Sequence, residues 1–210
     1  MTAPQAGTPS NPDVIVNGTS PAGPAVNGPV YIMLGPQQSC TRVYDNSSNF
    51  TGQFYSAQSG SESIDDLHGL ESGALCEFNF GYNEPGPGPV DATITFYAND
   101  GSDLPPISTI AGPYNVTGLP SGANDVTVTV PAGPVISKDV WMGVQFSTSS
   151  AGLLINDPPV VGASDDYFYE DGNYFSFGGN PQANFWLYFE VELAVPVEKS
   201  TWGGIKQLHD

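Results

Sequence analysis

Positive charge is scarce in this sequence. Its 210 residues include 4 Lys and Arg against 22 Asp and Glu, which gives a formal net charge of −18. Such a chain repels the phosphate backbone of nucleic acids and the anionic headgroups of membranes. There is also no run of 18 apolar residues that could span a bilayer. We therefore expect neither a nucleic-acid partner nor membrane insertion.

Histidine and the signatures of catalysis are almost absent too. The two histidines are His68 and His209, and the sequence contains no G-x-S-x-G, H-E-x-x-H or C-x-x-C motif. No catalytic residues are predicted, and a non-enzymatic protein is expected. A glycan hydrolase remains the enzymatic alternative, because it needs only two carboxylates, which any two segments of a fold can supply.

Only two cysteines occur, Cys40 and Cys76. One even pair is typical of a disulfide formed in an oxidising compartment, and two buried free thiols are the alternative. No signal peptide is recognisable, and Met1 followed by TAPQAGTPSNPD is typical of a mature N-terminus with an added Met. The expected location is therefore extracellular or at the cell surface.

Glycine and proline, by contrast, are plentiful, at 25 and 20 residues, and they punctuate segments of alternating polarity. The clearest such segment is Leu75–Asn99, which predicts two strands joined by a Pro- and Gly-rich loop. Val140–Phe146 and the stretch from Phe185 to Leu193 alternate in the same way. In contrast, the acidic segment Ser59–Gly73 is predicted to be a loop.

These patterns indicate about ten to twelve short strands and no helix. The predicted fold class is all-β, an antiparallel β-sandwich or jelly roll. The expected organisation is a flexible N-terminal arm with one short strand over residues 1–28, a β-sandwich domain over 29–195 and a short tail over 196–210. The arm is expected to pack on its own domain or to add a strand to a neighbouring copy.

No cofactor is required by the sequence, but calcium is the ion that its acidic loops would suit. Ca²⁺ binds several carboxylate and carbonyl oxygens. The predicted ligand set is Asp165, Asp166, Glu170 and Asp171. Smaller acidic pairs are Asp65 with Asp66 and Asp100 with Asp103. A solvated acidic loop is the alternative explanation for all of them.

Four aromatic residues fall on the polar faces of predicted strands: Tyr97, Trp141, Trp186 and Tyr188. Exposed aromatic rings bind sugars or partner proteins. These four are the candidate ligand-binding residues, unless a second layer or a chain terminus covers them.

Several short segments resemble those of predicted secreted β-sandwich proteins from environmental bacteria. The segments are Tyr44-Asp45-Asn46, Asp65-Asp66-Leu67, Phe78–Tyr82, Phe96–Gly101, Val140–Val144 and Gly152-Leu153-Leu154. The end of the chain, Ser200-Thr201-Trp202-Gly203-Gly204-Ile205-Lys206, is similar to a short tail found on many exported bacterial proteins. The resemblance implies an exported β-sandwich and carries no settled activity.

Two functions follow as hypotheses. The first is a non-catalytic extracellular structural or cell-surface protein, whose partners are copies of itself joined through the termini or an open sheet edge. The second is a carbohydrate-binding module of jelly-roll type, which binds polysaccharide through the four aromatics, with or without calcium.

Overall fold

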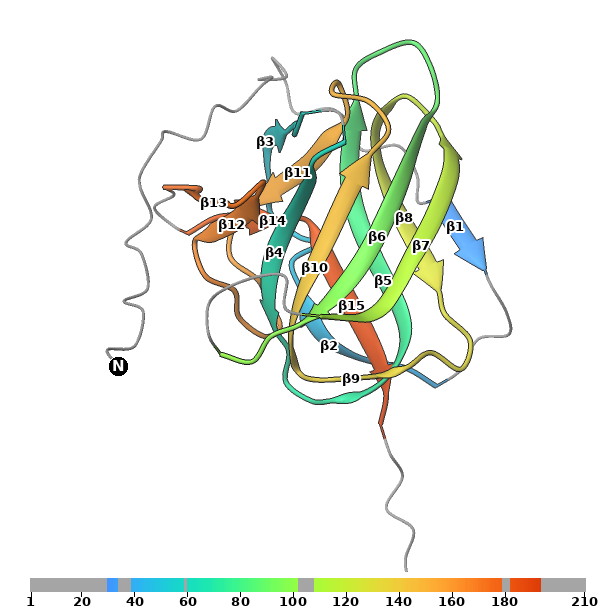
Figure 1. Ribbon diagram of the computed structural model, residues 1–210, viewed down its shortest axis with the longest axis vertical. Coiled ribbons are helices and arrows are strands. Elements are labelled where there is room, and N and C mark those ends of the chain that lie inside the picture. Colours follow the sequence, from blue (N-terminus) through green and yellow to red (C-terminus); the bar gives the residue numbers. More distant parts are fainter. Residues whose placement is uncertain (1–29, 34–38, 59, 102–107, 179–181, 194–210) are drawn as a thin grey trace, which may run out of the picture.

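The computed structural model describes residues 30–33, 39–58, 60–101, 108–178 and 182–193. The predicted arm over 1–28 and tail over 196–210 lie outside these ranges. The described residues form an all-β sandwich of two sheets packed face to face (Figure 1). The predicted β-sandwich is confirmed, and in the described part of the chain no helix has the length and apolarity needed to cross a membrane.

Sheet A has nine strands. They are β1 (Val30–Met33), β2 (Thr41–Asp45), β3 (Phe50–Tyr55), β5 (Gly73–Glu84), β8 (Gly122–Thr129), β9 (Val135–Ile136), β11 (Gly152–Asn156), β14 (Asn184–Phe185) and β15 (Leu187–Glu192). The long strand β5 is its centre and pairs with β8, β9, β11 and β15. At one edge, β1 pairs with β8 in parallel, whereas the other pairs in this sheet are antiparallel.

Sheet B has six antiparallel strands in the order β13-β12-β4-β10-β6-β7. Their bounds are β4 (Glu62–His68), β6 (Val90–Ala98), β7 (Thr109–Leu119), β10 (Asp139–Phe146), β12 (Tyr167–Glu170) and β13 (Asn173–Ser176). The two predicted strands of the Leu75–Asn99 segment, β5 and β6, belong to different sheets. Their Pro- and Gly-rich connection therefore crosses from one layer to the other (Figure 1).

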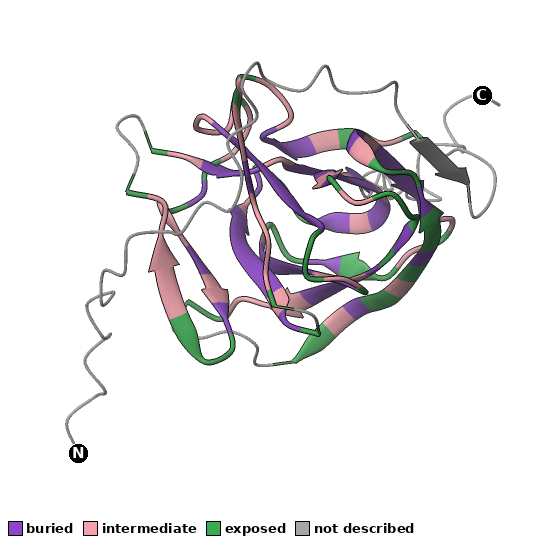
Figure 2. Ribbon diagram, turned by 90° about the horizontal axis from the view of Figure 1, so that it is seen from above, coloured by how far each residue is buried: buried purple, intermediate pink, exposed green. Residues whose placement is uncertain are grey.

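The core lies between the layers and follows the predicted alternation. Along β10, Val140, Met142, Val144 and Phe146 are buried in it. Aromatic rings join the sheets across the interior, with Phe78 of β5 centred 5.4 Å from Phe96 of β6. Figure 2 shows the buried stretches running along strands of both layers. Each fully buried aromatic side chain contributes about 1.5–3 kcal/mol, so this face dominates the stability of the fold.

The prediction for the acidic segment before β5 is wrong. The segment Ser59–Gly73, predicted as a loop, contains β4, which lies between β12 and β10 inside sheet B. Its two adjacent carboxylates, Asp65 and Asp66, are 0 % and 1 % exposed. Tertiary contacts override the low strand propensity of these residues.

Candidate functional site

The outer face of sheet B carries a continuous row of aromatic side chains. We call Tyr97, Trp141, Tyr167, Tyr169 and Tyr174 the aromatic band. Side chains alternate faces along a strand, and none of these five belongs to the core between the sheets, whereas their neighbours Phe96, Met142, Phe168 and Phe175 pack in or against it. The band therefore crosses β6, β10, β12 and β13 on the side facing away from the other layer.

Strand register and ring contacts show that the band is continuous. Trp141 lies directly opposite Tyr97 in the β10–β6 pair. Its ring is centred 6.4 Å from that of Tyr167. Tyr174 then lies 5.3 Å from both Tyr167 and Tyr169, edge-on to each. The four tyrosines are half-buried and Trp141 is 1 % exposed, so tyrosine rings form the accessible part of the band.

The Glu62 carboxylate lies beside the band, in space left open by Gly143. Glu62 of β4 accepts a hydrogen bond of 2.7 Å from the Tyr97 hydroxyl of β6, although β10 separates these strands. A Cβ atom at Gly143 would collide with the Glu62 carboxylate, so the absence of a side chain there lets Glu62 reach Tyr97 across β10. Burial raises the pKa of Glu62. Burial, and then the bond to Glu62, raise the pKa of Tyr97 to about 12.

An ionic network lies beside the middle of the band, where Asp66 of β4 is directly opposite Trp141 of β10. His68 Nε2 is 2.9 Å from Asp66, and His68 Nδ1 is 3.0 Å from Asp139. Asp66 also accepts hydrogen bonds from the backbone N–H of Asp165 and from the Ser164 hydroxyl. The bond to Asp66 is the largest influence on His68, whose pKa rises to about 9. The imidazole is therefore a cation at neutral pH.

The same network also has the geometry of a possible metal site. Ligand atoms of Asp66, His68 and Asp165 lie within 4.8 Å of one another, which is close enough for a metal site. A metal-binding histidine must offer a neutral ring nitrogen. Both nitrogens of His68 face carboxylates that favour the protonated ring, so a metal would bind here only by displacing that proton.

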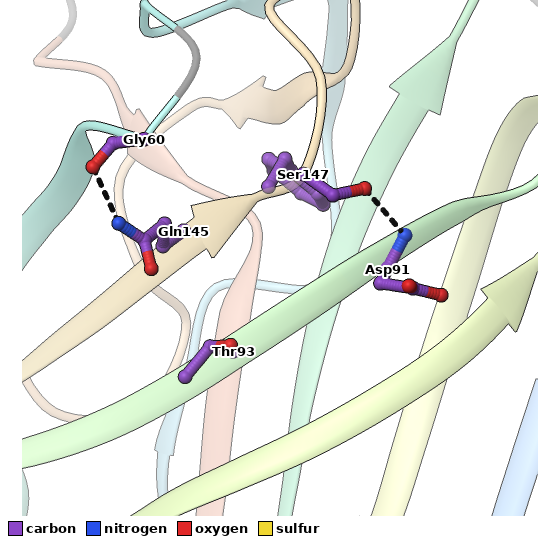
Figure 3. A pocket seen from close by; sticks show the side chains of 6 residues that line it. Gly60, Asp91, Thr93, Gln145 and Ser147 are labelled. Carbon is purple, nitrogen blue, oxygen red and sulfur yellow. Dashed lines mark hydrogen bonds between the residues drawn. The ribbon is translucent and has the colours of Figure 1, made fainter.

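A shallow hollow of about 230 Å³ continues the same face beyond Glu62 (Figure 3). Gln145 of β10 donates through its side-chain amide to the Gly60 carbonyl, and the Asp91 backbone N–H donates to the Ser147 hydroxyl at 3.0 Å. Thr93 and the Asp91 side chain also line the hollow. It presents hydroxyl, amide and carboxylate groups next to the aromatic band.

The four aromatics predicted to bind ligand do not form one surface. Tyr97 and Trp141 lie on the outer face of sheet B, whereas Trp186 and Tyr188 lie on the outer face of sheet A. Trp186 packs on Gly81 and Phe50. The alternative that these rings are covered applies to Trp141 and Tyr188, which are 1 % and 7 % exposed.

Tyr188 is instead part of a polar cluster on sheet A. The Arg42 guanidinium lies 3.7 Å from the centre of the Tyr188 ring and forms salt bridges with Asp45 and Glu190. The Tyr188 hydroxyl donates to Glu77 at 2.9 Å. These contacts join β2, β5 and β15, so they account for Tyr188 structurally.

The four residues predicted to bind calcium are also divided. Asp165 and Asp166 come just before β12, whereas Glu170 is its last residue and Asp171 comes just after it. Four residues of strand span about 13 Å, and this distance separates the two pairs along the chain. Asp166 accepts bonds from Ser176 and from the backbone of Ala183. Asp171 accepts from Ser61, and Glu170 is 6 % exposed. The structure does not bring the four carboxylates together.

The predicted disulfide between Cys40 and Cys76 is confirmed. It ties the residue before β2 to the central strand β5.

Sequence reasoning missed most of this site. Glu62 and Asp66 lie in the segment predicted as a loop, and the sequence analysis predicts no role for Tyr167, Tyr169 and Tyr174. The alternation Tyr167-Phe168-Tyr169, with the phenylalanine alone in the core, was the available signal. Comparisons of the chain with protein-family models, curated proteins and solved structures find no match.

Proposed function

We propose that this chain is a non-catalytic, extracellular β-sandwich domain that binds polysaccharide on the outer face of sheet B. The aromatic band carries the proposal, since half-buried tyrosine rings stack on the apolar faces of sugars. Glu62 and the polar hollow flank the band, and their oxygen and amide groups suit sugar hydroxyls.

Extracellular location is supported by the disulfide, which persists in oxidising compartments. The charge of −18 favours neutral polysaccharides over anionic ones, because like charges repel. A neutral glucan or mannan is thus a better candidate than a sulfated or uronic-acid polymer.

The test is retention of the full chain in gels that contain one neutral or one anionic polysaccharide each. Tyr169→Ala shortens the band without disturbing the core, so we expect at least a tenfold loss of affinity for the retained polymer. Trp186→Ala is the matched control, since it removes an aromatic from the opposite outer face and should leave retention unchanged. Equal retention of both variants, or no retention in any gel, contradicts the proposal, and turnover of the bound polymer contradicts its non-catalytic part.

A second function, a structural subunit that associates with copies of itself, is favoured by a different observation. β1, the first strand that the structure describes, lies parallel to β8 at the edge of sheet A, where the same four residues of a second copy could pair instead. Light scattering and negative-stain imaging test it. Concentration-dependent oligomers or filaments support this function, and a monomer that persists at high concentration argues against it.

A further inference from the structure

Four side chains near the junction of both sheets are completely buried and carry oxygen atoms that accept no hydrogen bond. They are Asn46, Asp65, Asn156 and Asn184, which we call the oxygen cluster. Each is 0 % exposed, and Oδ1 has no hydrogen-bond partner in any of the four; Nδ2 of Asn184 has none either. Buried polar groups are almost always hydrogen-bonded, so four such acceptors in one region require an explanation.

Backbone contacts bring these residues together. Asn156 and Asn184 lie directly opposite each other in the β11–β14 pair. Asn46, which follows β2, donates its side-chain amide to the Phe185 carbonyl at 2.9 Å. Asp65 reaches across from sheet B and accepts the Phe185 backbone N–H at 3.4 Å through Oδ2. All four residues therefore lie at, beside or opposite the two residues of β14.

The orientation of two amides is fixed by their nitrogen atoms. Nδ2 of Asn46 donates to Phe185, and Nδ2 of Asn156 donates to the Asn46 carbonyl at 2.5 Å. A carbonyl oxygen accepts only from a donor, so neither amide can be turned over without losing its bond. The unbonded atoms of Asn46 and Asn156 are thus oxygens. Together with Oδ1 of Asp65 and Asn184, the cluster has four unbonded acceptors against one unbonded donor, Nδ2 of Asn184.

The cluster also contains a buried negative charge. Among the described residues, the salt bridges join Arg42 to Asp45 and Glu190, and His68 to Asp66 and Asp139, and none reaches Asp65. A buried carboxylate without a cation is unfavourable, so Asp65 either holds a proton or faces a positive ion.

We propose that the oxygen cluster binds a calcium ion through Asp65 and the side-chain oxygens of Asn46, Asn156 and Asn184. Calcium takes carboxylate and amide oxygens together, and it completes its shell with water or backbone carbonyls. One ion would supply a positive partner to Asp65 and to three amide oxygens at once. A proton on Asp65 would supply a donor to only one of them.

This site differs from both acidic groups considered above. It uses none of Asp165, Asp166, Glu170 and Asp171. It also excludes the network of Asp66, His68 and Asp139, which lies on the other side of β4 and already contains a cationic imidazole. Because the site has a single carboxylate, its dissociation constant for calcium should lie in the range of extracellular calcium modules, about 10⁻⁴–10⁻³ M.

The experiment measures calcium and terbium binding to the full chain after removal of metal by a chelator. Terbium replaces calcium and emits when a nearby tyrosine is excited, and the Tyr55 ring is centred 6.2 Å from that of Phe185, the residue that bonds Asp65. We expect terbium emission that calcium displaces. We also expect calcium, at about 100 times its dissociation constant, to raise the unfolding midpoint by about 5–10 °C.

Two neighbouring substitutions decide the location. Asp65→Asn keeps the shape and removes the charge, so calcium affinity should fall at least tenfold. Asp66→Asn makes the same change one residue further, on the outer face, and should lower the calcium affinity clearly less than Asp65→Asn does, because Asp66 acts on the ion only from a distance. If Asp65→Asn does not fold, Asn184→Asp replaces it, because a second carboxylate should tighten binding at least fivefold.

Three results overturn the proposal. One is the absence of calcium and terbium binding to the wild type. Another is binding that survives Asp65→Asn but is lost in Asp66→Asn, which would place the ion in the outer network. The third is an Asp65→Asn variant that is more stable than the wild type in saturating calcium, which would identify Asp65 as a buried neutral acid.

Discussion

Tyr97 donates a hydrogen bond of 2.7 Å to Glu62, and the bond passes over a strand that lies between them. It connects β6 to β4 on the outer face without any backbone pairing between these two strands. The space above Gly143 makes the contact possible. A residue with no side chain is therefore part of the architecture of the aromatic band.

The first prediction concerns Gly143→Ala. The added methyl group displaces the Glu62 carboxylate, so the bond to Tyr97 is lost and the free energy of unfolding falls by about 1–2 kcal/mol. The pKa of Tyr97, about 12 in the native chain, should decrease in a spectroscopic titration. Gly88→Ala is the control, because a methyl group there meets open space. An unchanged Tyr97 titration in Gly143→Ala contradicts this interpretation.

The second prediction concerns pH. The folded pKa of His68, about 9, lies above its unfolded value of 6.5, so the folded state binds the proton more tightly. The stabilisation is complete below pH 6.5 and is lost as the pH rises through 9. Chemical denaturation from pH 6 to pH 10 should show this decline, and His68→Gln should flatten it. A decline of equal size in both proteins would assign it to other groups.

The buried carboxyl groups give a third prediction in the same direction. Burial is the first cause that raises the pKa values of Glu62, Glu77, Asp125 and Glu170. A raised carboxyl pKa means that the folded state gains a proton more readily, so ionisation of these groups opposes folding above their folded pKa. We expect the unfolding midpoint to be higher at pH 5 than at pH 8. Calorimetry in buffers of equal ionic strength tests this, and a higher midpoint at pH 8 contradicts it.

The fourth prediction concerns the disulfide. Cys40 and Cys76 are separated by 36 positions, and a closed loop of this length stabilises a fold by about 4 kcal/mol in the chain-entropy model. The double variant Cys40→Ser, Cys76→Ser should lose about this much in urea denaturation. A reducing agent should have the same effect on the native chain and none on the variant. A difference below 1 kcal/mol would mean that the sandwich holds these residues in place unaided.

Glu84 provides a fifth prediction, on the turns of the sandwich. Its carboxylate accepts hydrogen bonds from the hydroxyl groups of Thr148 and Ser150, both at 2.8 Å, and from the Gly86 backbone. It is 3 % exposed, so Glu84→Ala leaves three donors without this acceptor and should cost about 2–4 kcal/mol. Glu71→Ala, an exposed acid, serves as the control in the same denaturation series. Equal stability of the two variants would contradict the assignment.

How far the sequence predicts the structure depends on the kind of residue. Val140–Phe146 is predicted correctly because its core side is wholly apolar, and local alternation then determines the strand. β4 is missed because Asp65 and Asp66 look solvent-exposed in the sequence. Their burial is made tolerable by partners that are distant in the chain, such as Ser164 and the backbone of Phe185.

The same limit explains the aromatic residues. Alternation of polarity along the strands correctly places all four aromatics outside the core between the sheets: Tyr97, Trp141, Trp186 and Tyr188. It cannot tell which sheet a strand joins, because sheet membership is set by long-range pairing. The four residues therefore divide between two opposite surfaces, and the sequence gives no sign of this division.

Asp65 and Asp66 are consecutive, yet Asp65 faces the interior and Asp66 faces the outer surface. The two carboxylates therefore interact electrostatically across β4. A charge added next to one carboxylate changes how readily the other carboxylate binds a proton. A positive ion beside Asp65 would make Asp66 a weaker proton acceptor, and a ligand that alters Asp66 would alter affinity for the ion to the same extent. Through this single peptide unit, an ion bound inside the sandwich and a ligand bound outside would each change the other's affinity.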